Sequence, residues 1–160
     1  MKDRTKSYLK KTFRVFFYLY IIILSYFLFF SESFGRDTVT EGYRYNMKLL
    51  VEIRRFINYP GQNYELFLIN IIGNVIAFMP FGFLLPLLNK KYRRFFYIAF
   101  LCLMFSLAAE VIQLLTQVGI FDVDDLLLNT TGGILGYLLF AISNLIYRRI
   151  QPVRPRREGK

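Results

Sequence analysis

Apolar residues along the chain gather into four long runs, separated by polar stretches. The runs cover about residues 13–30, 66–88, 95–117 and 126–147. Each has roughly the 17–25 residues that a helix needs to cross a hydrocarbon core about 30 Å thick. Lipid offers the backbone no hydrogen-bond partner, and the runs lack the two-residue alternation of barrel strands. The pattern therefore predicts an all-α integral membrane protein, folded as a four-helix bundle.

The connection between the first and second runs, residues 31–65, contains a further helical pattern. Between residues 47 and 57, apolar side chains recur at helical spacing opposite charged ones, and Tyr59-Pro60-Gly61 ends the pattern. We predict a short external amphipathic helix here, before the second span. It would lie either in the head-group boundary of the membrane or over the end of the bundle. In both cases it would cover whatever lies beneath it.

Composition and charge agree with a membrane protein and indicate its orientation. The chain has 160 residues, of which 55% are hydrophobic, more than the roughly 45–50% of an ordinary soluble domain. Its net charge of +10 is concentrated in residues 1–14, 89–94 and 148–160, which carry +5, +4 and +5. Positively charged loops stay in the cytoplasm, so we predict that both termini and the second connection are cytoplasmic.

These basic segments suit the anionic head groups of the lipid bilayer, and we predict no nucleic-acid partner. The domain organisation that follows is a basic N-terminus (1–12), a transmembrane domain (13–147) and a basic tail (148–160). The first run is expected to be an uncleaved anchor, because Ser31-Glu32-Ser33-Phe34 lacks a small-x-small cleavage pattern. Cys102 is the one cysteine and histidine is absent, which excludes an intramolecular disulfide and histidine-based catalysis.

Polar residues inside the apolar runs are the candidates for function. Asn70 and Asn74 are four residues apart and share a helix face. Ser106, Glu110, Gln113 and Gln117 form one stripe along the third run, and an intramembrane carboxyl such as Glu110 suggests a functional site. With the predicted topology, all candidates fall in the outer half of the membrane or at its surface. They are Asn70, Asn74, Glu110, Gln113, Asp122, Asp124, Asp125 and Asn129.

Proline and glycine residues are expected to shape and pack the helices. Pro80 removes a backbone donor, so a kink or break is expected there, with Gly82 close by. Gly132 and Gly136 are spaced for the close approach of another helix, and Gly133 reinforces the pattern.

Several of these motifs occur together in a characteristic order. They are Asn70-Ile71-Ile72-Gly73-Asn74, Phe78 to Pro86, Glu110-Val111-Ile112-Gln113, and Asp122-Val123-Asp124-Asp125 through Asn129 to Gly136. Over residues 46–140 the chain resembles the VanZ-like family of small bacterial membrane proteins. It departs at Asn46-Met47-Lys48-Leu49-Leu50, where many members resemble Asn-Leu-x-Pro-Phe, and residues 116–121 lack the Arg that many members have. No role of that Arg can be carried over.

The resemblance implies a multi-pass protein of the bacterial plasma membrane. The family is named for a protein linked to low-level resistance to teicoplanin, a lipid-bearing glycopeptide antibiotic. The resemblance therefore implies a process in the cell envelope and leaves the biochemical mechanism open.

We expect a non-enzymatic protein whose outer polar pocket binds a lipid-linked cell-wall precursor or a lipoglycopeptide. Asn70, Asn74, Glu110, Gln113 and Asn129 would line the pocket, with Asp122, Asp124 and Asp125 at its mouth. One alternative is a membrane-embedded enzyme that acts on a lipid head group, with Glu110 as general acid or base; no other catalytic residue is assigned. Another is a regulator or oligomer that uses the glycine face around Gly132 and Gly136.

Structural interpretations of the same residues stay open. Glu110 could be a neutral acid hydrogen-bonded to Asn74 or Asn129, holding helices together. The aspartates could cap the fourth helix, since Asp124 and Asp125 lie where an N-cap and a favourable helix-dipole charge belong. A cation site of hard oxygen ligands is a weaker alternative, because the spacing is unlike that of a calcium loop. We predict neither a metal nor a cofactor.

Overall fold

The computed structural model describes residues 2–30, 43–51, 54, 58 and 64–150. Its long helices are α1 (Lys2–Phe30), α3 (Tyr64–Leu88), α4 (Phe95–Thr116) and α5 (Val123–Ile150). Each contains a stretch long and apolar enough to cross a membrane: Ser7–Phe30, Leu68–Leu88, Phe95–Thr116 and Val123–Ile150. The predicted helical fold with four membrane-spanning segments is confirmed.

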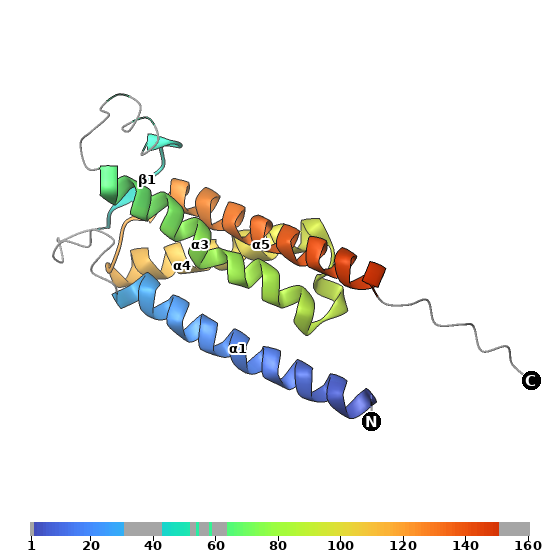
Figure 1. The fold of residues 1–160 in the computed structure, drawn as a ribbon. Helices are drawn as coiled ribbons and strands as arrows, with labels where there is room; N and C mark the ends of the chain where they lie inside the picture. The colour runs from blue at the N-terminus through green and yellow to red at the C-terminus, as the bar shows by residue number, and fades with distance from the viewer. Residues whose placement is uncertain (1, 31–42, 52–53, 55–57, 59–63, 151–160) are drawn as a thin grey trace, which may run out of the picture.

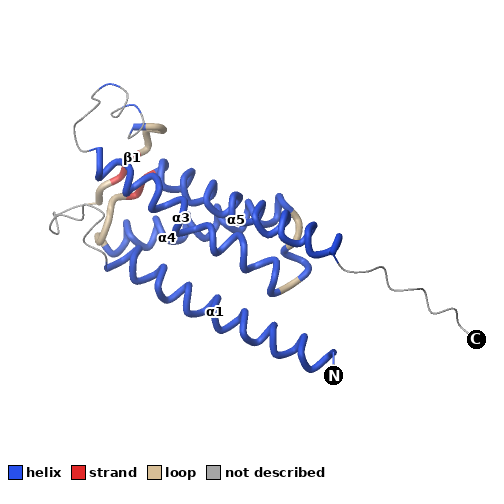
Figure 2. The backbone as a smooth tube through the Cα atoms, in the orientation of Figure 1, coloured by secondary structure: helices blue, strands red, loops and turns tan. Residues whose placement is uncertain are grey.

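The connections between these helices are short elements at the two ends of the bundle. A 3-10 helix, η2 (Lys90–Tyr92), joins α3 to α4. Strands β1 (Tyr45–Asn46) and β2 (Phe121–Asp122) form a two-stranded parallel ladder that pairs Tyr45 with Phe121 and Asn46 with Asp122 (Figure 2). The fourth helix was predicted to begin at about residue 126, and α5 already begins at Val123, so the connection after α4 is shorter than expected. Of the amphipathic helix predicted at 47–57, residues 47–50 are not helical, Val51 and Arg54 are helical, and residues 52–53 and 55–57 lie outside the described part of the chain.

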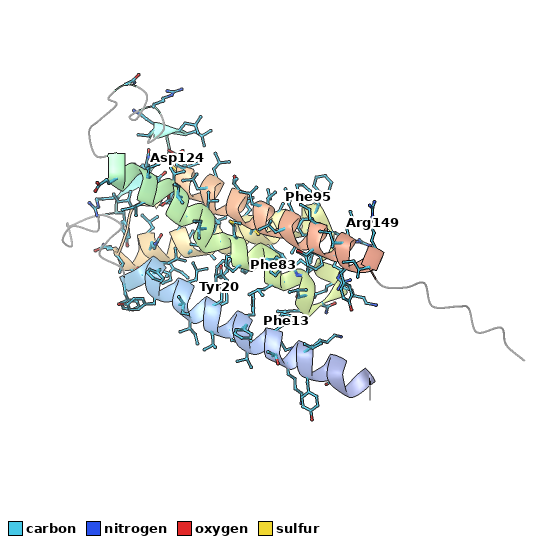
Figure 3. The ribbon with its side chains drawn as sticks, viewed as in Figure 1. Phe13, Tyr20, Phe83, Phe95, Asp124 and Arg149 are labelled. Carbon is cyan, nitrogen blue, oxygen red and sulfur yellow. The ribbon has the colours of Figure 1, made fainter. Side chains whose placement is uncertain are left out.

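Two ends of the bundle differ in charge, and Figure 1 shows what lies at each. At one end lie β1, β2, the start of α3 and the start of α5; we call this the acidic end. At the other end lie the start of α1, the α3–α4 connection and the end of α5; we call this the basic end. Figure 3 labels one residue of α5 at each end, Asp124 and Arg149. Helices that follow one another in the sequence therefore run in opposite directions between the two ends.

Helices α3 and α5 form the most extensive interface, although α4 lies between them in the sequence. Glycine makes this possible. A Cβ atom at Gly132 would overlap the Val75 carbonyl, and one at Gly136 would overlap the Met79 carbonyl. A Cβ at Gly82 of α3 would in turn overlap the Gly133 carbonyl of α5. Only a hydrogen atom fits at these positions, so the two backbones lie in direct contact.

The glycine face of α5 is therefore occupied by α3 of the same chain. A Cβ at Gly133 would also overlap the Cys102 side chain of α4. In this chain, Gly132 and Gly136 thus pack against α3, and an oligomer or regulatory partner at the glycine face stays a prediction.

Helix α3 continues through Pro80 and Pro86 to Leu88, so no break occurs at Pro80. The apolar core beside it contains Phe81, Leu85, Ile98 and Cys102. Helix α1 packs against this core and against α3, while most of its other side chains are exposed. Its Tyr20 hydroxyl donates to the Ala77 carbonyl of α3 over 2.7 Å (Figure 3). This polar contact ties α1 to the bundle at mid-height.

Candidate functional site

Residues 43–51 cross over the acidic end of the bundle, and we call this segment the strap. The strap is held to the start of α5 by backbone and side-chain hydrogen bonds. The Phe121 N–H donates to the Arg44 carbonyl over 3.1 Å, which extends the β1–β2 pairing. The Asn46 side-chain amide donates to Asp122 Oδ2, also over 3.1 Å. The chain before α3 is thus joined to the segment Asp122–Asp125 at the start of α5, which we call the acidic turn.

Asp124 holds the far end of the strap. Its two carboxylate oxygens accept hydrogen bonds from successive backbone N–H groups, those of Leu50 and Val51, the second over 2.9 Å. Leu50 has φ of 61°, in the left-handed region that a residue with a side chain adopts at a cost. A left-handed residue turns consecutive N–H groups to one side, which makes a cradle for an anion. The buried Asp124 carboxylate is the anion in that cradle.

Asp122, which accepts from Asn46 of the strap, also caps the start of α5. Its Oδ1 accepts from the Asp124 N–H over 2.8 Å, the geometry of an N-cap residue. The sequence suggested Asp124 and Asp125 for the cap, but α5 begins at Val123, so Asp122 takes that position. Asp124 and Asp125 fall in the first turn, where negative charge is favoured by the helix dipole.

Glu110 reaches the acidic turn from α4. Its Oε2 accepts from the Asp122 backbone N–H over 2.9 Å, and the side chain is only 2% exposed. The expected structural partners were Asn74 and Asn129, and the structure instead pairs both amides elsewhere. Asn129 donates to Ser106, one helical turn further from the end of α4 than Glu110, and Asn74 donates to Asn70 and Asp125.

Asn70 and Asn74 form a chain of amides that ends on α5. The Asn74 amide donates to Asn70 Oδ1 over 3.0 Å and to Asp125 Oδ1 over 2.6 Å. The shared helix face predicted for the two asparagines explains the first contact. The close α3–α5 approach at the glycines explains the second, because it brings Asp125 within reach of Asn74.

Asn129 is buried deeper in the bundle and pairs with α4. Its amide nitrogen donates to the Ser106 hydroxyl over 2.9 Å, and both side chains are at most 1% exposed. The other end of the amide, Asn129 Oδ1, has no hydrogen-bond partner. An unpaired buried carbonyl costs about 1–3 kcal/mol. This cost offsets part of the stability that the Asn129–Ser106 contact contributes.

Gln113 acts on α1. Its amide donates to the Leu28 backbone carbonyl over 2.7 Å. Leu28 is in the last turn of α1, where carbonyls lack an intrahelical donor. Gln117, the end of the predicted polar stripe, is exposed and adopts the left-handed conformation that ends α4.

Burial divides the eight candidates into a supporting layer and a surface. The buried ones, all at most 7% exposed, are Asn74, Glu110, Gln113, Asp124 and Asn129. Asn70, Asp122 and Asp125 are half-buried, as is Asn46 of the strap. We call these four half-buried residues the rim. They present two carboxylates and two side-chain amides at the acidic end.

Sequence patterns missed the strap and therefore Asn46. The signal was present, since Asn46 begins the segment that stands where many family members resemble Asn-Leu-x-Pro-Phe. Tyr20 was also missed, because a tyrosine in an apolar run carries no sign that its hydroxyl is paired. Within the described residues, no group of three or more His, Cys, Asp or Glu side chains is arranged to hold a metal ion.

Comparison with known proteins gives a family and one curated relative. Residues 17–145 match the family model described as VanZ/LLP1. Protein VanZ from Enterococcus faecium is 42% identical over 74 residues. That alignment covers 46% of this chain and 45% of the relative, so it spans less than half of each. No solved structure matches.

Proposed function

The chain belongs to the VanZ/LLP1 family, and from this we propose that it is a multi-pass protein of the bacterial plasma membrane that binds a lipid-bearing or lipid-linked amphiphile. The polar part of that ligand contacts the rim at the acidic end. The ligand is a lipoglycopeptide such as teicoplanin or a lipid-linked cell-wall precursor. By binding it, the protein contributes to glycopeptide resistance or to envelope homeostasis.

The orientation follows from charge. Exposed Lys90, Lys91, Arg94, Arg148 and Arg149 lie at the basic end. Positively charged segments near membrane spans stay in the cytoplasm. The basic end is then cytoplasmic and both termini are inside, which directs the rim and the strap to the outer face of the membrane.

The observation that carries the proposal is the convergence of three helices and the strap on one polar cluster. Glu110 of α4 binds the acidic turn, Asn74 of α3 binds Asp125, and Asp124 binds the strap. Polar residues at membrane depth are costly, and the contacts between helices stabilise by only about 0.6 kcal/mol on average. We attribute the retention of so many polar groups at one place to ligand contact at the rim.

The chemistry of the rim favours some ligands over others. Asp122 and Asp125 present carboxylate acceptors, and ionised carboxylates only accept hydrogen bonds. Hydroxyl and ammonium groups, as on the sugars and amines of a glycopeptide, are suitable donors. A bare phosphate would be repelled by like charge. A cell-wall precursor would therefore bind through its sugar or peptide part and not through its phosphates.

Binding to this surface also suits a ligand with an apolar tail. The helices below the rim carry exposed apolar side chains, among them Ile69, Ile72 and Ile76 of α3. A tail inserted in the bilayer beside α3 would hold the polar part of the ligand at the height of Asn70. Tethering two contacts in this way raises the effective concentration of the second.

The enzymatic alternative rests on Glu110 as acid or base. In the structure, Glu110 is buried and one of its oxygens accepts from the Asp122 backbone. This contact positions the acidic turn and does not by itself create a reactive group. A substrate would need access to a side chain that is 2% exposed. We therefore assign Glu110 a supporting role beneath the rim.

The test uses the full chain in nanodiscs and measures binding of teicoplanin, with an unacylated glycopeptide as comparison. We expect Asp125→Asn combined with Asn70→Ala to weaken teicoplanin binding. Glu65→Gln, which removes an exposed carboxylate at the same end, serves as the control. Equal binding by the wild type and the rim variant would overturn the proposed site for this ligand.

Profiling of lipids and cell-wall precursors that co-purify with both forms tests the second ligand class. In cells, Glu110→Gln should keep the fold and reduce glycopeptide resistance less than Glu110→Ala. Conversion of a lipid substrate by the purified wild type, lost in the Glu110→Gln variant, would instead establish the enzyme.

A further inference from the structure

The basic end carries a surface that the proposed function does not use. Within the described side chains, the acidic residues Glu65, Glu110, Asp122, Asp124 and Asp125 all lie toward the acidic end, while the α3–α4 connection contributes four cations to the other. No described carboxylate pairs with Lys90, Lys91, Arg93 or Arg94. Among the side chains that the structure describes, the connection is thus a cluster of positive charge with no carboxylate partner.

The turn that presents these cations is fixed. Asn89 caps η2 by accepting from the Lys91 N–H over 3.1 Å, and the Arg93 N–H donates to the Lys90 carbonyl. The Arg93 carbonyl in turn accepts from the Tyr137 hydroxyl of α5 over 2.8 Å. The backbone of the turn is thus held by hydrogen bonds within the turn and by α5.

Arg93 is the fixed element of the cluster. Its Nε donates to the Pro86 carbonyl over 3.2 Å, and its guanidinium carbon lies 5.5 Å from the centre of the Phe140 ring. The Nε donor is thus paired with a carbonyl near the C-terminus of α3, where the helix dipole favours a positive charge. The guanidinium has five N–H donors, and the four on its terminal nitrogens have no partner among the described residues. They are available to a ligand.

Apolar groups lie beside these donors. Phe95 and Phe96 begin α4 directly after Arg94, and they are 40% and 84% exposed. Tyr92 stacks on Tyr97, with Lys91 Nζ 4.9 Å from the Tyr92 ring. Tyrosines of this kind mark the level of lipid head groups. A ligand at this place meets fixed cations on its polar side and exposed aromatic rings on its apolar side.

We propose that the α3–α4 connection binds the phosphate of an anionic phospholipid, with Arg93 as the fixed contact, Lys90 and Arg94 as flanking charges, and Phe95 and Phe96 against the acyl chains. A guanidinium matches two phosphate oxygens at once, which an ammonium cannot do. The site lies at the end of the bundle opposite the rim. It neither requires nor excludes the ligand proposed there.

The experiment is native mass spectrometry of the full chain, equilibrated with equal amounts of phosphatidylglycerol and phosphatidylcholine. The wild type should retain phosphatidylglycerol preferentially. Lys90→Gln with Arg94→Gln should lower that retention to near the phosphatidylcholine level, because the two cations flank the bound phosphate directly. Lys10→Gln with Lys11→Gln removes the same charge from exposed residues of α1 at the same end, and should change retention little.

Arg93→Lys separates a bound phosphate from general attraction. The lysine keeps the positive charge but cannot bind two phosphate oxygens at once, so retention of phosphatidylglycerol should fall although the net charge is unchanged. If the double variant does not fold, Arg94→Gln alone replaces it, because Arg94 is exposed and makes no side-chain cap contact.

Three results would overturn the proposal. One is equal retention of the two lipids by the wild type, and another is an equal loss in the α1 control. The third concerns the source of the phosphate. Inorganic phosphate would displace the bound lipid, or would by itself raise the Tm as much as phosphatidylglycerol vesicles do. That result would establish a free-anion site in place of a lipid site.

Discussion

The side-chain amide of Gln113 donates a hydrogen bond to the backbone carbonyl of Leu28 over 2.7 Å. The contact joins α4 to the last turn of α1, whose carbonyls lack intrahelical donors. With the Tyr20–Ala77 contact at mid-height, it gives α1 two polar attachments along an interface that is otherwise apolar. A residue first selected as a candidate ligand contact thus positions the first helix.

Replacing Gln113 by Leu should loosen α1 without unfolding the other three helices. Interhelical hydrogen bonds in membranes contribute about 0.6 kcal/mol on average and about 1.7 kcal/mol at most, so the loss should be of that size. The measurement is the Tm of the purified protein, with cross-linking between cysteines introduced in α1 and α4. Gln117→Leu is the control, because Gln117 is exposed at the residue that directly follows the same helix. Similar losses in both variants would contradict the assigned contact.

Asp124→Ala should release the strap. The variant removes two hydrogen bonds to a charged acceptor, each worth about 1.5–3 kcal/mol in a typical protein. Hydrogen exchange at the Leu50 and Val51 amides should accelerate strongly, while exchange within α5 changes less. Asp124→Asn keeps one acceptor oxygen and should give an intermediate result. Unchanged protection of both amides in the alanine variant would show that other contacts hold the strap.

Gly136→Ala should destabilise the bundle. The new Cβ would overlap the Met79 carbonyl, and backbone cannot move aside as a flexible side chain would. Overpacking of this kind typically costs about 1–3 kcal/mol. Gly119→Ala is the matched control, since its Cβ would lie 3.4 Å from Gln113 Cβ, an ordinary contact. Thermal unfolding in one detergent compares the two, and an equal Tm would mean that α3 and α5 approach less closely than described.

Asn129 and Ser106 should show strong coupling in a double-mutant cycle. Ser106→Ala leaves a buried amide with neither end paired, so it should destabilise by roughly 1–3 kcal/mol. Asn129→Leu with Ser106→Ala removes both partners and should recover much of that loss, because paired apolar replacements are often nearly neutral. Additive losses, measured by unfolding of the single and double variants, would show that the two side chains do not interact.

Sequence patterns predicted the four helices because their cause is local. Each run is long and apolar enough to require a helix in lipid, whatever the rest of the chain does. Helix length and alternating direction also predicted that Glu110 and the aspartates lie toward the same end of the bundle, but they placed Glu110 below the aspartates, whereas its side chain contacts the Asp122 backbone. The start of α5 was placed three residues late, because aspartates suit both a turn and a first helical turn.

The partners within the cluster were not predictable in the same way. Depth places Asn74, Glu110 and Asn129 near one another, but rotation of each helix decides which side chains meet. Here the glycine contacts between α3 and α5 set that rotation, and Asn74 therefore meets Asp125. The strap is harder still, because the contact of Asn46 with Asp122 joins residues 76 positions apart. No periodicity within either segment carries that information.

The strap has a consequence for synthesis of the protein. Val51 and its acceptor Asp124 are 73 residues apart, so the ribosome completes the strap long before its partner exists. At roughly 5–20 residues per second, the delay is on the order of 4–15 s. During that interval α3 also lacks α5, the helix against which it packs most extensively. The first three spans must therefore persist in the membrane as an incomplete intermediate, and arrival of the fourth completes the acidic end and the α3 interface in one late step.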